Sequence, residues 1–170
     1  MSMDSSLRRV REQLSELRTL AALPEARLHA CHDTTSAWCA AEHLDHLVKV
    51  SASILRRLAD AKAEALPKGI SAVGRAILFL GWIPRGKGKA PERLRGARVS
   101  ADALQTSIND LQQLLDTFPA DAVKRRAGER LLPHPRFGGL TPAQAMRFAA
   151  VHNEHHFKIV REVLGRVGSN

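Results

Sequence analysis

Apolar residues recur every three or four positions along four long segments of the chain, which is the spacing of one face of an α-helix. The pattern predicts amphipathic helices over residues 4–22, from 38 or 39 to about 65, over 101–118, and from 141 onward. Each buries one apolar stripe and leaves a polar face in water. The chain is therefore expected to pack four long helices around a common core.

The predicted helix ends carry the residue types that such ends require. Thr141 suits the N-cap of the last helix, Pro142 its first position, and Gln144 completes a capping box with Thr141. Ser100 is placed to cap the third helix, and Pro119 stops it. These signals support the helical interpretation independently of the apolar spacing.

The connecting segments are shorter and less regular. They comprise 25–36 as a loop or short helical turn, 70–83 as a short buried helix, 84–98 as a loop, 120–130 as weakly helical, and 131–140 as a connection rich in Pro and Gly. No stretch alternates apolar and polar residues, so no strand is expected. The prediction is an all-α fold, a four-helix bundle that forms one domain over residues 1–170.

Two histidines interrupt the apolar stripe of the last helix. His152 and His156 lie one turn apart, so both rings leave the helix on the same side. Imidazoles at this spacing commonly hold a transition metal. A hydrogen-bonded pair packed in the core is the alternative, and the spacing alone leaves both open. His155 lies at the edge of the stripe and is expected to flank the pair.

The second long helix supplies two further candidates. Cys39 stands three residues before Glu42, in the arrangement of a capping box. By helical angle, His43 falls inside the apolar stripe, whereas His46 falls on its flank beside Val50. Periodicity alone therefore favours His43 as the inward ring.

Charge adds a candidate of a different kind. The formal net charge is +9, which favours anionic partners. Loop 84–98 holds one acid, Glu92, and six of the cations: Arg85, Lys87, Lys89, Arg93, Arg95 and Arg98. The loop is either a solvated, mobile insertion or a lid in which Arg85, Lys87 and Lys89 bind an anionic group.

Composition excludes several classes of protein. No apolar run reaches the roughly 20 residues that a membrane span needs, and the N-terminal residues lack a signal-peptide core, so no membrane partner is expected. Two cysteines, Cys31 and Cys39, do not make a disulfide scaffold, and a cytoplasmic location is the expectation. The absence of Tyr makes a base-stacking platform for nucleic acid hard to build.

Two motifs resemble those of a known family. WCAAEHLDHL, at 38–47, is similar to the W-S-x-x-E-x-x-x-H-L motif of the DinB/YfiT-like superfamily. HPRFGGLTPAQAMRFAAVHNEHH, at 134–156, resembles the H-P-x-F-G-x-L-T-x-x-Q … H-x-x-H-H segment of one uncharacterised branch. With the four-helix layout, the resemblance covers nearly the whole chain. Cys39 stands where the family usually has Ser.

The resemblance implies a three-histidine metal site made by His46, His152 and His156, against the angular preference for His43. His43, His155 and Glu42 would then be flanking groups. Glu42, Asp45 and Glu154 are expected to be exposed helix charges, so no general base is assigned. The resemblance also implies an up-down-down-up bundle, frequent homodimers, and, in some members, transferases that use low-molecular-weight thiols.

Three functions follow as hypotheses. The first is a metal-dependent enzyme, thiol-transferase-like or hydrolase-like. Three imidazoles leave a coordination position open on zinc, nickel or iron, and such a metal lowers the pKa of a bound water or thiol. The second is a non-catalytic basic module for nucleic acid or another polyanion, ranked lower because no nucleic-acid motif is present. The third is a structural bundle.

Overall fold

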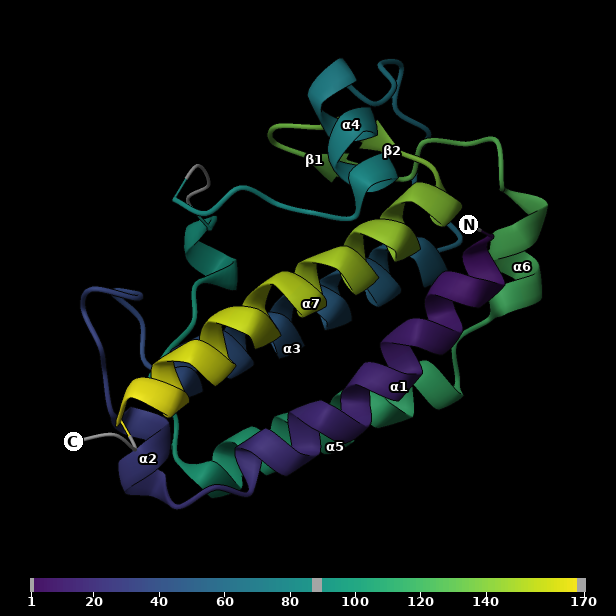
Figure 1. The fold of residues 1–170 in the computed structure, drawn as a ribbon. Coiled ribbons are helices and arrows are strands. Elements are labelled where there is room, and N and C mark those ends of the chain that lie inside the picture. The colour runs from purple at the N-terminus through teal and green to yellow at the C-terminus, as the bar shows by residue number, and fades with distance from the viewer. Residues whose placement is uncertain (1, 87–89, 168–170) are drawn as a thin grey trace.

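The computed structural model describes residues 2–86 and 90–167, and four long helices dominate it (Figure 1). They are α1 (Met3–Ala21), α3 (Ala40–Ala59), α5 (Ala101–Asp116) and α7 (Pro142–Val167). The shorter elements are α2 (Glu25–His29), α4 (Ala72–Leu80), a 3₁₀ helix (Glu92–Leu94), α6 (Ala120–Arg125), β1 (Leu132–His134) and β2 (Gly138–Leu140). The predicted all-α fold is confirmed.

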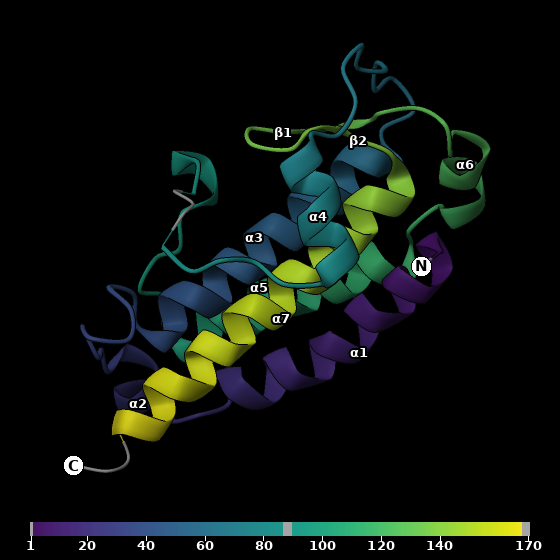
Figure 2. The same ribbon diagram turned by 45° about the horizontal axis from the view of Figure 1, so that its top comes forward.

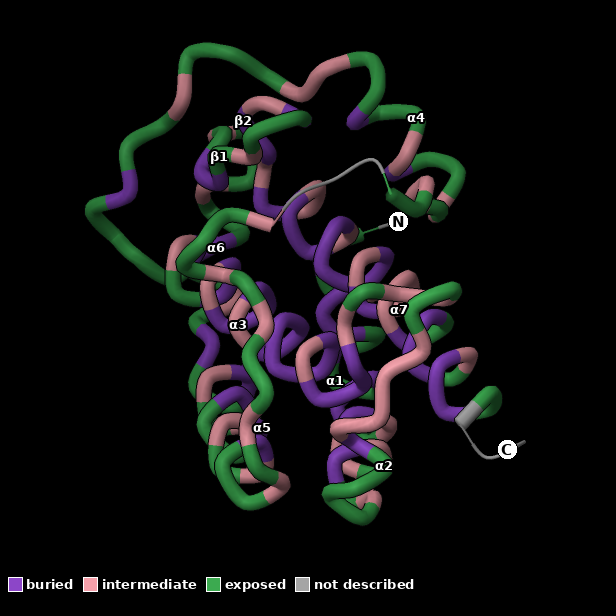
Figure 3. The backbone as a smooth tube through the Cα atoms, turned by 90° about the vertical axis from the view of Figure 1, so that its left-hand side faces the viewer, coloured by how far each residue is buried: buried purple, intermediate pink, exposed green. Residues whose placement is uncertain are grey.

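The long helices surround one core. α7 packs against α1 and α3, and α5 packs against the same two helices from the opposite side. Figure 1 shows α1 and α7 running in one direction and α3 and α5 in the other, which is an up-down-down-up order. In Figure 3, buried and exposed stretches alternate along each of these helices. The buried stretches supply the core, with Leu44, Leu104, Leu115 and Phe157 among its most enclosed side chains.

The predicted caps are present. Thr141 N donates to Gln144 Oε1 at 3.0 Å, and Gln144 N donates to Thr141 Oγ1 at 3.4 Å. Cys39 N donates to Glu42 Oε2 at 2.9 Å, so the second helix also begins with a capping box. These contacts satisfy backbone N–H groups that the first turn of a helix leaves unpaired.

Two expectations about secondary structure are wrong. α3 ends at Ala59 instead of near residue 65, because the Asp60 side chain accepts from Lys62 N at 2.9 Å and forms a turn in place of the helix. The connection 131–140 contains an antiparallel hairpin, in which Leu132 pairs with Leu140 and His134 with Gly138. Its strands of three residues are too short to show alternation.

The helix expected to be buried within 70–83 is also corrected. α4 forms, but it lies on the outside of the bundle over α7 (Figure 2). Phe79 is 88% exposed, Leu80 66% and Trp82 57%, while Leu78 faces inward. The sequence shows that this short helix is apolar. Whether both of its faces are buried depends on the rest of the fold.

A buried polar chain links three of the long helices. Ser51 Oγ on α3 donates to Asn153 Oδ1 on α7 at 3.3 Å, and Asn153 Nδ2 donates to Gln13 Oε1 on α1 at 3.3 Å. Gln13 Nε2 then donates to the Ala150 carbonyl at 2.9 Å. Each amide therefore has a partner inside the core, which fixes the rotation of α7 directly beside His152.

The hairpin contains a titrating group outside the histidine group on α3 and α7, at the end of β1. His134 Nδ1 accepts from Arg136 N at 3.2 Å and Phe137 N at 3.1 Å. Burial, and secondarily the charge of Arg136, lowers the pKa of His134 from 6.5 to about 4. As the pH falls, His134 therefore takes up a proton in the unfolded chain before it does so in the folded protein. Its contribution to the free energy of unfolding is complete above pH 6.5 and is lost as the pH falls to about 4.

We expect His134→Asn to weaken the pH dependence of the free energy of unfolding between pH 6.5 and 4. The Asn Oδ1 can replace Nδ1 as the acceptor, and the variant cannot take up the proton. Urea unfolding of metal-free protein should show a slope between pH 6.5 and 4 that is smaller by up to about 1.4 kcal/mol per pH unit. An unchanged slope would show that His134 does not titrate in this range.

Candidate metal centre

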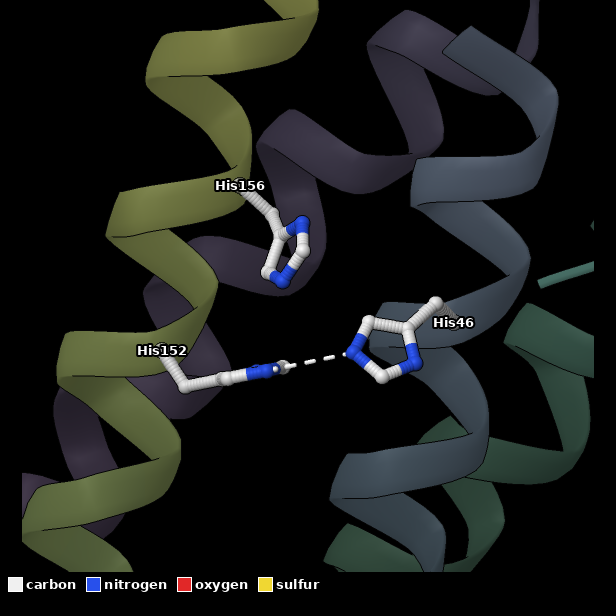
Figure 4. A group of neighbouring side chains, drawn as sticks. All are labelled: His46, His152 and His156. Carbon is white, nitrogen blue, oxygen red and sulfur yellow. Dashed lines mark hydrogen bonds between the residues drawn. The ribbon is translucent and has the colours of Figure 1, made fainter. Parts of the chain in front are cut away.

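Three histidines from two helices meet at one point between α3 and α7 (Figure 4). His46 projects from α3, and His152 and His156 project from α7 one turn apart. One ring nitrogen from each lies within 4.8 Å of the others. His46 is only 5% exposed, and the other two are largely buried. This is the side-chain group that could hold a metal ion among residues 2–86 and 90–167.

The orientation of His46 is set by a backbone carbonyl. His46 Nδ1 lies 2.5 Å from the oxygen of Leu94, at the end of the 3₁₀ helix. A carbonyl oxygen only accepts hydrogen bonds, so Nδ1 carries the proton and Nε2 presents its lone pair. That lone pair faces His152 Nε2 at 3.2 Å. Two facing nitrogens at this distance need a proton or a cation between them.

His156 is oriented by His43. The Nδ1 atoms of the two rings are 2.8 Å apart, and His43 Nε2 lies 2.9 Å from Ser36 Oγ. When His156 Nδ1 donates to His43, the Nε2 of His156 is left unprotonated and faces the other two rings. His43 Nε2 then carries the proton of that ring and donates to Ser36 Oγ. His43 therefore acts on a group member and does not belong to the three.

The geometry fits a transition metal. Tetrahedral zinc binds imidazole nitrogens at about 2.0–2.1 Å, which places two of them about 3.3 Å apart. The His46–His152 pair has nearly this separation, and the nitrogens of all three rings lie within 4.8 Å of one another, so the rings would draw together around a bound ion. His152 Nδ1 is buried without a hydrogen-bond partner among the described residues, so packing against Phe148 holds this ring.

Burial keeps the rings neutral, which is the form that binds metal. Burial lowers the pKa of His152 and His156 well below the ordinary value, and the neighbouring imidazoles lower it further. Burial also lowers the pKa of His46, although the Leu94 carbonyl opposes this shift. The pKa of His43 falls to about 4, again chiefly through burial. At neutral pH, protons therefore do not compete for these nitrogens.

Trp38 forms a wall of the site. The Trp38 ring centroid lies 5.2 Å from that of His46, 5.3 Å from that of His43 and 6.4 Å from that of His156. The indole therefore covers the histidine group on one side. Sequence reasoning named Trp38 only as part of a motif and missed this contact.

His155 and Glu42, which were predicted to flank the site, make different contacts. His155 packs its ring edge-on against His156 and hydrogen-bonds the backbone of Ile83. It lines a cavity of about 100 Å³ together with Trp82 and Lys158. Glu42 caps α3, and its carboxylate bonds to Cys39 N and pairs with Arg98 instead of contacting the three rings.

The expectation that Asp45 is an exposed helix charge is wrong. Asp45 is 4% exposed, and its Oδ2 accepts from Ala97 N at 2.8 Å. The helical pattern could not reveal this burial, because the segment that covers Asp45 is a loop far away in the sequence.

The structure describes the basic loop only in part, so a lid that binds an anionic group stays a prediction. Arg85 forms an ion pair with Glu162 at 2.6 Å, so its charge is already compensated. Lys87 and Lys89 lie outside the described residues. The stretch 94–97 is held against α3, so this part of the loop is not a freely solvated insertion. The Leu94 carbonyl also escaped prediction, since side-chain patterns carry no signal for a main-chain acceptor.

The fold and the site together define an all-α protein with a buried three-histidine group. Residues 6–160 match the family model of the DinB superfamily, and the chain belongs to that superfamily. It is 27% identical over 132 residues to the uncharacterized protein YuaE of Bacillus subtilis (strain 168), covering 76% of this chain and 79% of YuaE. No solved structure gives a significant match. No helix of the described residues is long and apolar enough to cross a membrane.

The position of Trp38 gives a direct optical test. Open-shell ions such as Ni²⁺ or Co²⁺ quench a nearby excited indole, and the chain has only two tryptophans. We expect either ion to quench the emission of Trp82→Phe, in which Trp38 remains, much more strongly than that of Trp38→Phe. Equal quenching of the two variants would place the bound ion away from the three histidines.

Proposed function

We propose that this protein is a metal-dependent enzyme whose metal is held by His46, His152 and His156. The observation that carries the proposal is the convergence of three neutral imidazoles, with the His46 lone pair directed inward by the Leu94 carbonyl. Zinc, nickel and iron(II) all accept such a donor set. When bound, the metal supplies a Lewis acid with an open position, at which a water or thiol has a lowered pKa.

The chain's own residues provide the surroundings for that chemistry. His43 holds the Nδ1 side of His156, and Leu94 holds the Nδ1 side of His46. Trp38 shields one side of the group from water. We expect the reaction to be thiol-transferase-like, with a low-molecular-weight thiol as co-substrate, or hydrolase-like. A homodimer is the expected assembly.

A basic module for a polyanion is the weaker alternative. Several cations already have acidic partners: Arg85 with Glu162, Lys124 with Asp4, and Arg161 with Glu16. These pairs reduce the charge available for phosphate groups, on whose neutralisation such binding depends. Nucleic acid is therefore not the proposed partner.

Metal content tests the proposal. Protein purified without an affinity tag should carry about one equivalent of a transition metal by mass spectrometry, and His152→Ala should lose it, since two imidazoles remain. His32→Ala is the matched control, because His32 lies in the segment between α2 and α3 and outside the three-histidine group. Loaded protein should then be assayed for thiol-dependent transfer.

The opposite result is equally clear. Wild-type protein that holds no metal after incubation with zinc, nickel or iron(II), and does not differ from His152→Ala, would show that the histidines are not a metal site. Loss of metal in His32→Ala would show that the effect is not specific to the site.

A further inference from the structure

We propose that Asp45 and Lys49 are positioning residues that clamp segment 94–97 onto α3, and that this clamp selects the nitrogen His46 presents to the site. The inference rests on the proposed function only in treating His46 as a metal ligand. The hydrogen bonds and the ion pair of Asp45 and Lys49 involve none of the three histidine rings. Their charges have opposing electrostatic effects on the pKa of His46, and their positioning effect acts through the backbone of the segment.

The clamp consists of three contacts. Asp45 Oδ2 accepts from Ala97 N at 2.8 Å, Lys49 Nζ donates to the Arg95 carbonyl at 3.1 Å, and Lys49 Nζ pairs with Asp45 Oδ2 at 2.7 Å. Two residues one turn apart on α3 therefore bind two backbone groups of the segment, one on each side of Gly96. A carboxylate that is 4% exposed is costly unless it is paired and hydrogen-bonded, and here it is both.

Gly96 shows how closely the segment approaches the helix. A Cβ built on Gly96 would overlap the backbone carbonyl of Glu42, which cannot move aside because it belongs to α3. The segment therefore lies against the helix backbone with no space for a side chain. Arg98 continues this attachment with its Nε 3.7 Å from Glu42 Oε2.

The position of Leu94 follows from these contacts. Its carbonyl immediately precedes the gripped residues and lies 2.5 Å from His46 Nδ1. If the segment moved away, Nδ1 would lose its acceptor. A neutral imidazole without a partner prefers to carry its proton on Nε2, which would block the atom that faces the site. The clamp therefore acts on the tautomer of His46, and through the tautomer on metal affinity.

Two independent variants loosen the segment. Lys49→Met keeps the aliphatic stem but removes the bond to the Arg95 carbonyl and the ion pair with Asp45. Gly96→Ala leaves every charge in place and forces the backbone away from Glu42. Lys124→Met is the matched control, because Lys124 pairs with Asp4 and Asp121 on α1 and α6 and also loses an ion pair.

The first readout needs no metal. Nitrogen-15 chemical shifts of the metal-free protein should show His46 protonated on Nδ1 in wild type and in Lys124→Met, and shifted toward Nε2 protonation in Lys49→Met and Gly96→Ala. The second readout is metal affinity, measured by competition with a chromophoric chelator. It should fall by about 10- to 100-fold in the two clamp variants, as is typical when an outer partner of a ligand is lost. Circular dichroism verifies the helices of each variant.

The outcomes distinguish the clamp from the metal centre. Folded clamp variants that keep His46 protonated on Nδ1 and bind metal within about twofold of wild type would overturn the inference. A tautomer shift in a protein whose wild type binds no metal would support the clamp and defeat the proposed function. If one variant fails to fold, the other still decides between these results.

Discussion

A neutral imidazole has one N–H and one lone pair, so the partner of one nitrogen decides what the other can do. The histidine group of this protein depends on that constraint. The Leu94 carbonyl holds the proton of His46 on Nδ1, and the His43–Ser36 chain can take the proton of His156 on its Nδ1 side. With both outer nitrogens occupied, the inner nitrogens face one another as lone pairs, an arrangement that a cation stabilises.

The bundle supplies the conditions under which this constraint matters. Burial between α3 and α7 lowers the pKa of the rings, so neutral imidazoles are the stable species at neutral pH. The Gln13–Asn153–Ser51 chain fixes α7 one residue away from His152. Trp38 covers one side. Each contact removes freedom from the rings before any ligand arrives, which is the usual basis of tight and selective binding.

The sequence predicted those features that depend on one helix at a time. Apolar periodicity located α1, α3, α5 and α7, and the i, i+4 spacing placed His152 and His156 on one face. The choice between His43 and His46 needed a second element. His46 lies on the flank of its stripe as calculated, but segment 94–97 covers that flank and turns it into interior.

The other features that the sequence did not predict have the same cause. Asp45 is buried by this segment, α4 has an uncovered apolar face, and the hairpin forms between strands too short for periodicity. Each depends on contacts between residues far apart in the chain. Patterns within a single stretch of sequence carry no information about such contacts, and least of all about a main-chain carbonyl.

The most direct measurement of the central claim is anomalous diffraction from a crystal of metal-loaded protein, recorded at the absorption edge of the metal. The account predicts one anomalous peak at bonding distance from the Nε2 atoms of His46, His152 and His156. His43 should be hydrogen-bonded to His156 and should not be a ligand of the metal. A peak that includes His43 as a ligand, or one located away from these three rings, would contradict it.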